Sequence, residues 1–491
     1  MADHVEQLEE LARAALANGE EEAALAEIAP AAEATGSARL WQFTGLLQRS
    51  LEQHADALQS LTRASLLAPD DAGIAHGLAR VALEAGVDAV ALFERAGELA
   101  PTDGAVLLGL ASAKFAAGRG SEAEAQLDAV LQQSPMWLEG HMQLAQLRSL
   151  LGRRDRSPHS IERALRASPG DASLWAALLN LEVIEANFAG LDEAVAEGRR
   201  AGLPESMLLP FEAIAAAEQA QTERADQLFD AIDAELRQTI AVWQIRHLLR
   251  AGRLDEAIAL IDRNLDREQA AQFWPYASIA WRIAGDPRWQ WLERDGQLVS
   301  TFDLADRLPP LDELAARLRS LHVANGEYLD QSVRGGTQTD GPLLSRIEPE
   351  VGALRAVIVD AVQQYLTGLP PRDPAHPLLR EPRDRRIRFA GSWSVRLRGS
   401  GFHADHVHPQ GWISSALYVA LPGTVQSDPP KAGWLKLGEA PTELRVDAPP
   451  VQLVEPKPGR LVLFPSWMWH GTVPFPQGER LTVAFDVQLP I

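Results

Sequence analysis

A regular repeat in the first part of this 491-residue chain constrains its fold more than any other feature. Proline-marked turns recur at intervals of 32, 34 and 34 residues, at Pro69, Pro101, Pro135 and Pro169. Glycines divide each interval into two stretches of helix length, at Gly86, Gly118 and Gly152. Because proline is tolerated at a helix start and glycine provides a left-handed stop, each unit is predicted to be a helical hairpin. One hairpin cannot bury its own apolar face, so neighbouring hairpins are expected to stack into a solenoid.

Length and charge limit the possible partners. A chain of this length is expected to form more than one domain, because single hydrophobic cores stop growing at smaller sizes. Residues 1–300 hold 46 acidic and 26 basic side chains, whereas residues 301–491 hold 21 and 20. The acidic first part disfavours nucleic acid and anionic membranes as partners. It is compatible with a basic protein partner, although a solvated exterior that keeps the helices soluble is the simpler interpretation.

Two further absences narrow the class of protein. The sequence has no apolar run long enough to cross a bilayer and does not start like a signal peptide, so a cytoplasmic protein without a membrane partner is predicted. It also has no cysteine, which excludes disulfides, thiolate metal sites and cysteine nucleophiles. A bound metal would have to use histidine, carboxylate or backbone oxygen ligands.

From Phe389 onward the pattern changes from helix to strand. Alternating or apolar runs predict strands over residues 392–397, 412–421, 460–464 and 481–487. Glycine and proline turns separate them, including one at Gly399–Gly401, and the whole predicts a sandwich or a jelly roll.

The sequence between the repeats and these strands is mixed. Residues 311–321 and 349–366 predict helices, and the repeat fades near residue 290, where we place the domain boundary. The polar segment Gln331–Thr339 predicts a loop: either a binding loop in which Arg334 contacts a carboxylate, or a surface turn. The basic run Arg380–Arg388 predicts a solvated connector.

Four histidines and an arginine in the second part indicate a metal centre. Three histidines lie within six residues, and a fourth is followed ten residues later by an arginine: His403, His406, His408, His470 and Arg480. In a regular strand His406 and His408 share one face, so both imidazoles can reach one ion. His403 and Asp405 share the opposite face, so only one of the two pairs is expected to line the pocket, unless a bulge near Gly401 alters the phase.

The repeats resemble a known family. Their period, together with Gly118-Arg119, Glu122-Ala123 and the run from Gly252 to Ala257, is similar to tetratricopeptide repeats over roughly residues 5–285. The resemblance implies a concave groove that receives a protein or peptide. The alternative is that the array only spaces, dimerises or stabilises the domain that follows.

The second part resembles the 2-oxoglutarate- and Fe(II)-dependent oxygenases that are fused to tetratricopeptide repeats, in the prolyl-hydroxylase-like superfamily. The similar segments are residues 401–409, 413–419, 458–466, His470 and residues 480–482. The resemblance implies a multidomain chain: an all-α solenoid over residues 1–290, then a double-stranded β-helix (jelly-roll or cupin-like) domain with flanking helices over residues 291–491. It also implies Fe(II) as cofactor and O2 and 2-oxoglutarate as cosubstrates.

The same resemblance implies roles for individual residues. His470 and one close pair would hold the iron, while Arg480 and Thr482 would bind the far carboxylate of 2-oxoglutarate with help from Tyr418. A bidentate guanidinium is also, on chemical grounds, the strongest receptor for a carboxylate. The recurring His-x-His-Pro spelling favours His406 and His408 as the close pair, and the His-x-Asp pair of the wider superfamily, here His403 and Asp405, stays open.

Three functions are compatible with these residues. The first is an oxygenase that hydroxylates a protein or peptide side chain, such as Pro, Asn, Asp or His, recruited by the repeats. The second is a non-catalytic repeat scaffold that carries a cupin-like domain. The third is a metal-dependent isomerase or dioxygenase that does not use 2-oxoglutarate.

Overall fold

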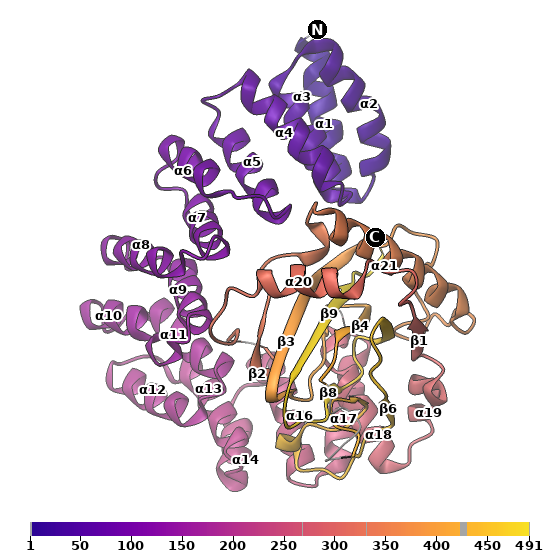
Figure 1. The fold of residues 1–491 in the computed structure, drawn as a ribbon. Helices are drawn as coiled ribbons and strands as arrows, with labels where there is room; N and C mark the ends of the chain where they lie inside the picture. The colour runs from indigo at the N-terminus through magenta and orange to yellow at the C-terminus, as the bar shows by residue number, and fades with distance from the viewer. Residues whose placement is uncertain (1, 268, 330, 423–429, 491) are drawn as a thin grey trace.

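The computed structural model describes residues 2–267, 269–329, 331–422 and 430–490, which form a helical array followed by a β domain (Figure 1). The array comprises α1 (Ala2–Asn18), α2 (Glu21–Thr35), α3 (Ala38–Ser50), α4 (His54–Leu67), α5 (Ala72–Glu84), α6 (Val90–Leu99), α7 (Gly104–Ala116), α8 (Gly120–Gln133), α9 (Leu138–Leu150), α10 (His159–Ala167), α11 (Ala172–Ile184), α12 (Phe188–Arg200), α13 (Glu205–Glu218), α14 (Thr222–Ala231), α15 (Ala234–Thr239), α16 (Ala241–Arg250), α17 (Leu254–Leu265), α18 (Trp274–Ala284) and α19 (Arg288–Glu293). The predicted stack of helical hairpins is confirmed.

Aspartate, not proline, caps three of the four helices that follow the proline-marked turns, and α9 follows Trp137 without a side-chain cap. Pro69 lies in the turn before α5, and the side chain of Asp71 caps that helix by accepting the backbone N–H of Ile74 at 2.9 Å. Asp103 and Asp171 cap α7 and α11 in the same way. A capping carboxylate satisfies a backbone donor that has no partner inside the helix. The predicted glycine stops are confirmed, because the three dividing glycines have φ values of +74° to +76°.

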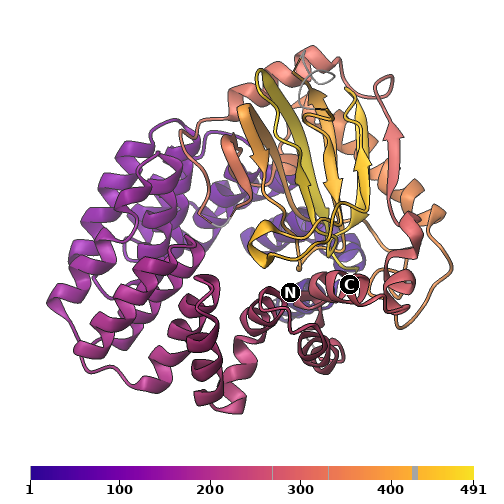
Figure 2. The ribbon, with the colours of Figure 1, turned by 90° about the horizontal axis from the view of Figure 1, so that it is seen from below.

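The array curves around the β domain, as Figures 1 and 2 show from two directions. Contacts between the two parts come from the beginning, middle and end of the array. Near the beginning, Arg388 forms an ion pair with Glu21. In the middle, the backbone N–H of Asn325 donates to the carbonyl oxygen of Leu150 at 2.8 Å. Near the end, the indole of Trp469 donates to the carbonyl oxygen of Pro275 at 3.0 Å.

The β domain contains two antiparallel sheets flanked by α20 (Leu311–Leu321) and α21 (Pro349–Gly368), both of which were predicted. A six-stranded sheet has the order β1 (Ser300–Asp303), β7 (Arg460–Pro465), β4 (Ile413–Ala420), β9 (Glu479–Val487), β3 (Phe389–His403), β2 (Val333–Gln338). A three-stranded sheet has the order β6 (Gln452–Val454), β5 (Leu435–Leu437), β8 (His470–Thr472). A helical solenoid followed by an antiparallel β domain is therefore confirmed, and the jelly-roll detail stays a prediction.

Two predictions on the β2–β3 edge are wrong. Residues Gln331–Thr339 are not a loop, because Val333–Gln338 form β2 and pair with β3. Arg334 Nη1 donates to the carbonyl oxygens of Gln331 and Val333 and lies 3.9 Å from the carboxylate of Glu327. The turn expected at Gly399–Gly401 is part of β3, where the register of the β2–β3 pair shifts. A Cβ on Gly401 would lie 2.7 Å from two carbonyl oxygens, so this irregularity requires glycine.

The segment Arg380–Arg388 is not only a solvated connector. Arg388 donates to both carboxylate oxygens of Glu21, at 3.0 and 2.7 Å, and Arg386 donates to the carbonyl oxygen of Leu51 at 3.0 Å. The segment therefore joins the β domain to the first hairpins of the array.

The predicted domain boundary near residue 290 falls within α19, and β1 begins ten residues later. The division into residues 1–290 and 291–491 stays a prediction. Across the described residues, no helix combines the length and the apolar composition needed to cross a membrane.

The Arg388–Glu21 pair gives a test of how the two parts are joined. Glu21 is 1 % exposed, and the hydrogen bond from Arg388 lowers its pKa to about 2. Arg388→Ala leaves a buried carboxylate without its ion pair, with the Ser50 hydroxyl still donating to it, so we expect a loss of about 3 kcal/mol in unfolding free energy at neutral pH. The folded pKa lies below the reference value of 4.5, so the contribution of the pair is complete above that pH and is lost as the pH falls through 2.

Urea unfolding of both proteins over a pH series measures this effect. The difference between the two midpoints should shrink as the pH falls from about 4.5 to 2. Arg307→Ala is the control, because Arg307 pairs with the exposed Asp360, and it should leave the midpoint nearly unchanged. An equal effect of both substitutions would contradict the expectation.

Candidate metal centre

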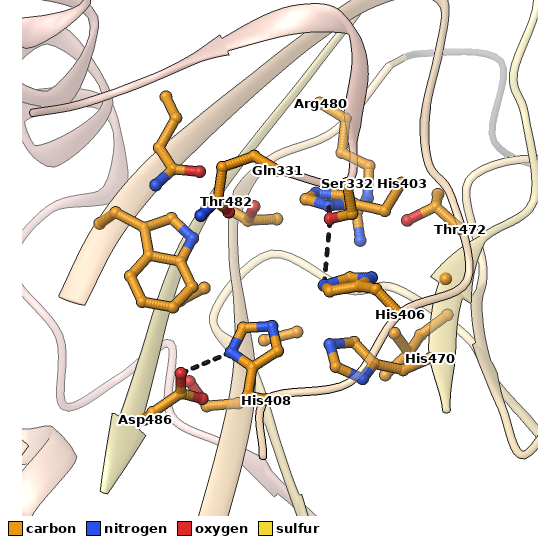
Figure 3. Close-up of a pocket in the computed structure, with 17 residues that line it drawn as sticks. Gln331, Ser332, His403, His406, His408, His470, Thr472, Arg480, Thr482 and Asp486 are labelled. Carbon is orange, nitrogen blue, oxygen red and sulfur yellow. Dashed lines mark hydrogen bonds and ion pairs between the residues drawn. The ribbon is translucent and has the colours of Figure 1, made fainter. Parts of the chain in front are cut away.

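Three histidine side chains meet in one buried pocket next to the end of β3 (Figure 3). His406 and His470 pair through two backbone hydrogen bonds of 3.0 Å, and the N–H of His408 donates to the carbonyl oxygen of Ser466 at 2.9 Å. The centre of the His406 ring lies 4.0 Å from that of His470 and 5.0 Å from that of His408. One ring nitrogen from each of the three lies within 4.8 Å of the others, which makes them a candidate ligand set.

Backbone carbonyl groups and one carboxylate hold the Nδ1 side of each of the three histidine rings. Each Nδ1 has an oxygen acceptor: the carbonyl of Ala404 for His406, the carbonyl of Met468 for His470, and the carboxylate of Asp486 for His408. We assign the proton of each ring to Nδ1 from this network, which leaves the lone pair on Nε2. A metal-binding histidine usually has such a partner on its other nitrogen.

Burial keeps the imidazoles of His406 and His470 neutral. Desolvation lowers the pKa of His406 to about 3 and that of His470 well below its ordinary value, and the neighbouring histidines lower both further. A neutral imidazole is the form that binds a metal. The pocket therefore favours the ligand form of these side chains.

The strand-face argument for choosing one close pair does not hold in this structure. β3 ends at His403, so the residues after it do not alternate as in a strand. His403 lines the same pocket as His406 and His408. Asp405 does not join them: its carboxylate accepts a hydrogen bond from Lys436 at 2.9 Å, and burial raises its pKa to about 6.

Arg480 lies in the same pocket and is 2 % exposed. Its guanidinium is 5.0 Å from the centre of the Tyr418 ring. Within the described part of the chain, Arg480 forms no ion pair with a carboxylate, and its Nε has no hydrogen-bond partner. Burial removes the Arg480 guanidinium from water and thereby lowers its pKa. An arginine buried in this way has the chemistry of a receptor for an anionic ligand.

One face of β9 forms a wall of the pocket that contains the histidines. Alternate residues of this strand face the pocket: Arg480, Thr482, Ala484 and Asp486. Thr482 lies opposite Tyr418 in the β4–β9 pairing. Tyr418 itself is fully buried beneath Arg480 and outside the pocket lining.

Sequence reasoning missed several residues of this pocket. Asp486 shares its strand face with Arg480 and Thr482, so the alternation of β9 could have revealed it. Ser332 has no such signal; its hydroxyl lies 3.1 Å from His403 Nδ1 and 3.0 Å from His406 Nε2. The ring of Trp393 stacks on that of His408, with the ring centres 5.6 Å apart.

Comparisons with known proteins agree with this architecture. Residues 391–486 match the family described as "Putative 2OG-Fe(II) oxygenase", and residues 87–147 match the family described as "Tetratricopeptide repeat". No curated protein matches the chain. The chain thus combines a tetratricopeptide-repeat region with a domain of the 2OG-Fe(II) oxygenase family, as the sequence predicted.

Several solved structures are similar over parts of the chain. A tetratricopeptide repeat protein from Parabacteroides merdae is 18% identical, with 48% of this chain and 96% of that chain covered and a TM-score of 0.30. A prolyl-4-hydroxylase from Pseudomonas putida is 18% identical, with 40% and 96% covered and a TM-score of 0.26. Yeast Tom70 is 15% identical, with 56% and 62% covered and a TM-score of 0.35.

The oxygenase family implies Fe(II) and 2-oxoglutarate, and the residues of the pocket fit both. Three imidazoles with Nε2 lone pairs form a nitrogen ligand set of the kind that iron accepts. The buried guanidinium of Arg480 supplies the charge that a dicarboxylate requires.

Metal titration can separate the two candidate ligand pairs. We expect His406→Ala and His470→Ala each to weaken Co(II) binding by at least about a hundredfold, since each removes one of three ligands. Asp405→Asn should change the Co(II) affinity by less than about threefold, because Asp405 is paired with Lys436. Calorimetry at constant pH gives the affinities, and loss of Co(II) binding in Asp405→Asn alone would reverse the assignment.

Proposed function

We propose that the chain is a 2-oxoglutarate- and Fe(II)-dependent oxygenase that hydroxylates a protein or peptide side chain recruited by the repeat array. One observation carries the proposal. A three-histidine cluster and a buried arginine without a carboxylate partner among the described residues line the same pocket. Fe(II) and 2-oxoglutarate would together supply the oxidative chemistry, in which one atom of O2 is inserted into a C–H bond, the other enters succinate, and 2-oxoglutarate loses CO2.

In this proposal His406, His408 and His470 hold Fe(II) through Nε2. Three neutral ligands leave the iron more positive than a set containing a carboxylate would. Asp486 offsets part of that difference from behind, because its carboxylate accepts the Nδ1–H of His408 and makes that ring a stronger donor. The usual ligand set includes a carboxylate that binds the metal directly. In this proposal the carboxylate of Asp486 instead contacts a metal ligand, the His408 ring.

Arg480 and Thr482 bind the far carboxylate of 2-oxoglutarate in this proposal. Both are nearly inaccessible, at 2 % and 3 % exposure, so an ion pair formed there is little screened by water. The Tyr418 ring beneath Arg480 holds the guanidinium in place, and Trp393 covers His408. These side chains orient the cosubstrate and exclude water from the centre.

A second site supports a polypeptide substrate. A cleft of about 750 Å³ lies between the last helices of the array and the segment that follows His408. Its lining combines indole rings with proline and glycine, including Trp274, Trp291, Pro409, Gly411 and Trp412. The acidic excess of the array is compatible with a basic polypeptide. The cleft itself is lined by charges of both signs: Asp262, Asp266, Arg267, Arg288 and Arg380.

The two other candidate functions explain less of the pocket. A non-catalytic scaffold has no use for a buried arginine that lacks a carboxylate partner among the described residues, and burying such a charge is costly. A metal-dependent enzyme that does not use 2-oxoglutarate needs the histidines but not Arg480.

Replacement of Arg480 tests the proposal. With Mn(II) bound, we expect Arg480→Met to weaken 2-oxoglutarate binding by at least about thirtyfold, because the buried ion pair is lost. The Mn(II) affinity should stay unchanged, and the thermal midpoint should not fall, since methionine removes a buried charge without opening a cavity. Calorimetry and thermal unfolding measure the three quantities.

The matched control is Arg460→Met, because Arg460 lies on β7, pairs with Asp303 and is outside the pocket. It should bind 2-oxoglutarate normally. Iron-loaded wild-type protein should also convert 2-oxoglutarate to succinate, and His470→Ala should not. If the wild-type protein binds no 2-oxoglutarate with Mn(II) present, the oxygenase proposal is wrong.

A further inference from the structure

The short strand β8 carries a second polar side chain next to the candidate metal ligand His470. Thr472 follows His470 by two residues, so both side chains project from the same face of the strand. Both line the pocket, and Thr472 is 2 % exposed. The residues already proposed to bind 2-oxoglutarate, Arg480 and Thr482, lie on a different strand, β9.

The backbone fixes the place of Thr472 relative to the metal centre. β8 pairs with β5, where His470 lies opposite Leu437 and Thr472 lies opposite Leu435. His470 also forms an isolated antiparallel bridge with His406. Residues two apart on a strand have Cα atoms about 7 Å from each other, so the spacing between the metal ligand and Thr472 can vary little.

Thr472 lies at the end of the pocket that contains Arg480. Figure 3 shows these two residues at one end and His408 with Asp486 at the other. In this view the hydroxyl of Thr472 is turned into the pocket. Arg480 and Thr482 come from the six-stranded sheet, whereas Thr472 comes from the three-stranded sheet. Both sheets therefore contribute polar side chains to the pocket.

The hydroxyl groups of Thr472 and Thr482 have no hydrogen-bond partner among the described residues. Both side chains are nearly inaccessible, at 2 % and 3 % exposure, and burying a hydroxyl without a partner is costly. The guanidinium of Arg480 can only donate, so a ligand shared by all three groups must be an acceptor. A carboxylate has about four lone-pair sites, enough for a guanidinium fork and two hydroxyls.

We propose that Thr472 is a third donor to the far carboxylate of 2-oxoglutarate, so that Arg480 and Thr482 hold this group from one sheet and Thr472 holds it from the other. The inference rests on the proposed function, because it concerns the same cosubstrate site. It also assigns Thr472 a role in specificity. His470 and Thr472 contact opposite ends of the bound cosubstrate, so their spacing on β8 sets the length of the dicarboxylate that fits.

Calorimetry on the Mn(II)-loaded protein tests the inference without relying on turnover. The two probes are 2-oxoglutarate and 2-oxopentanoate, which has the same carbon chain and the same metal-binding end but no far carboxylate. We expect Thr472→Val to weaken 2-oxoglutarate binding at least about tenfold, because a hydrogen bond to a charged group is lost. The affinities for 2-oxopentanoate and for Mn(II) should stay unchanged.

Two further measurements separate the hydroxyl from the shape of the side chain. Thr472→Ser keeps the hydroxyl and should bind 2-oxoglutarate within about threefold of the wild-type protein. The preference of the wild-type protein for 2-oxoglutarate over the longer 2-oxoadipate should shrink in Thr472→Val, and an unchanged preference would refute the role in specificity.

The matched control is Thr44→Val in α3. Thr44 is 1 % exposed, donates to the carbonyl oxygen of Leu40 at 2.8 Å and lies outside the pocket. This variant makes the same chemical change at another buried threonine. It should bind both probes like the wild-type protein.

The failure of this inference differs from the failure of the proposed function. If the wild-type protein binds no 2-oxoglutarate with Mn(II) present, the proposed function is wrong. If it does bind, and Thr472→Val binds 2-oxoglutarate equally well or loses affinity for both probes alike, the role of Thr472 is refuted while the oxygenase proposal stands. Should Thr472→Val not fold, as judged by circular dichroism, Thr472→Ala decides through the same ratio of the two affinities.

Discussion

The alternation of strand β9 is the constraint on which the rest of the site depends. One face of this strand carries the arginine proposed to hold 2-oxoglutarate, the threonine beside it and the aspartate that orients His408. Because side chains on one face of a strand repeat every second residue, the carboxylate receptor and the support of a metal ligand are fixed relative to each other by the backbone alone. Pairing with β3 and β4 on either side makes that backbone rigid.

The repeat array is more than an attachment to this site. Its first hairpin forms a buried ion pair with the β domain, its middle binds the backbone of Asn325 and Gly326, and its last helices border the cleft after His408. At α9 the array contacts residues 325–329 of the chain itself. The side-chain amide oxygen of Gln146 accepts the backbone N–H of Leu329 in this contact.

Much of the fold could be predicted because strong periodic signals coincide with buried elements. The helices α20 and α21 and the strands β4, β7 and β9 have long apolar or alternating patterns, and each was predicted close to its observed bounds. β2 was missed because its sequence is polar and rich in glycine, and only its pairing with β3 makes it a strand. β5, β6 and β8 are three residues long, too short to show any period.

The sequence by itself determined the hairpin period, the class of the second domain and the group of residues from which the site is made. Local chemistry suffices for the hairpins and the strands, because capping, turn formation and alternation depend on neighbours along the chain. The class of the second domain and the roles of its site residues came from the family resemblance. Only the tertiary structure decided that Asp405 pairs with Lys436, that Asp486 supports His408 and that Ser332 bridges two imidazoles. Those contacts join residues that lie tens of positions apart, and a sequence pattern carries no record of which distant groups are buried together.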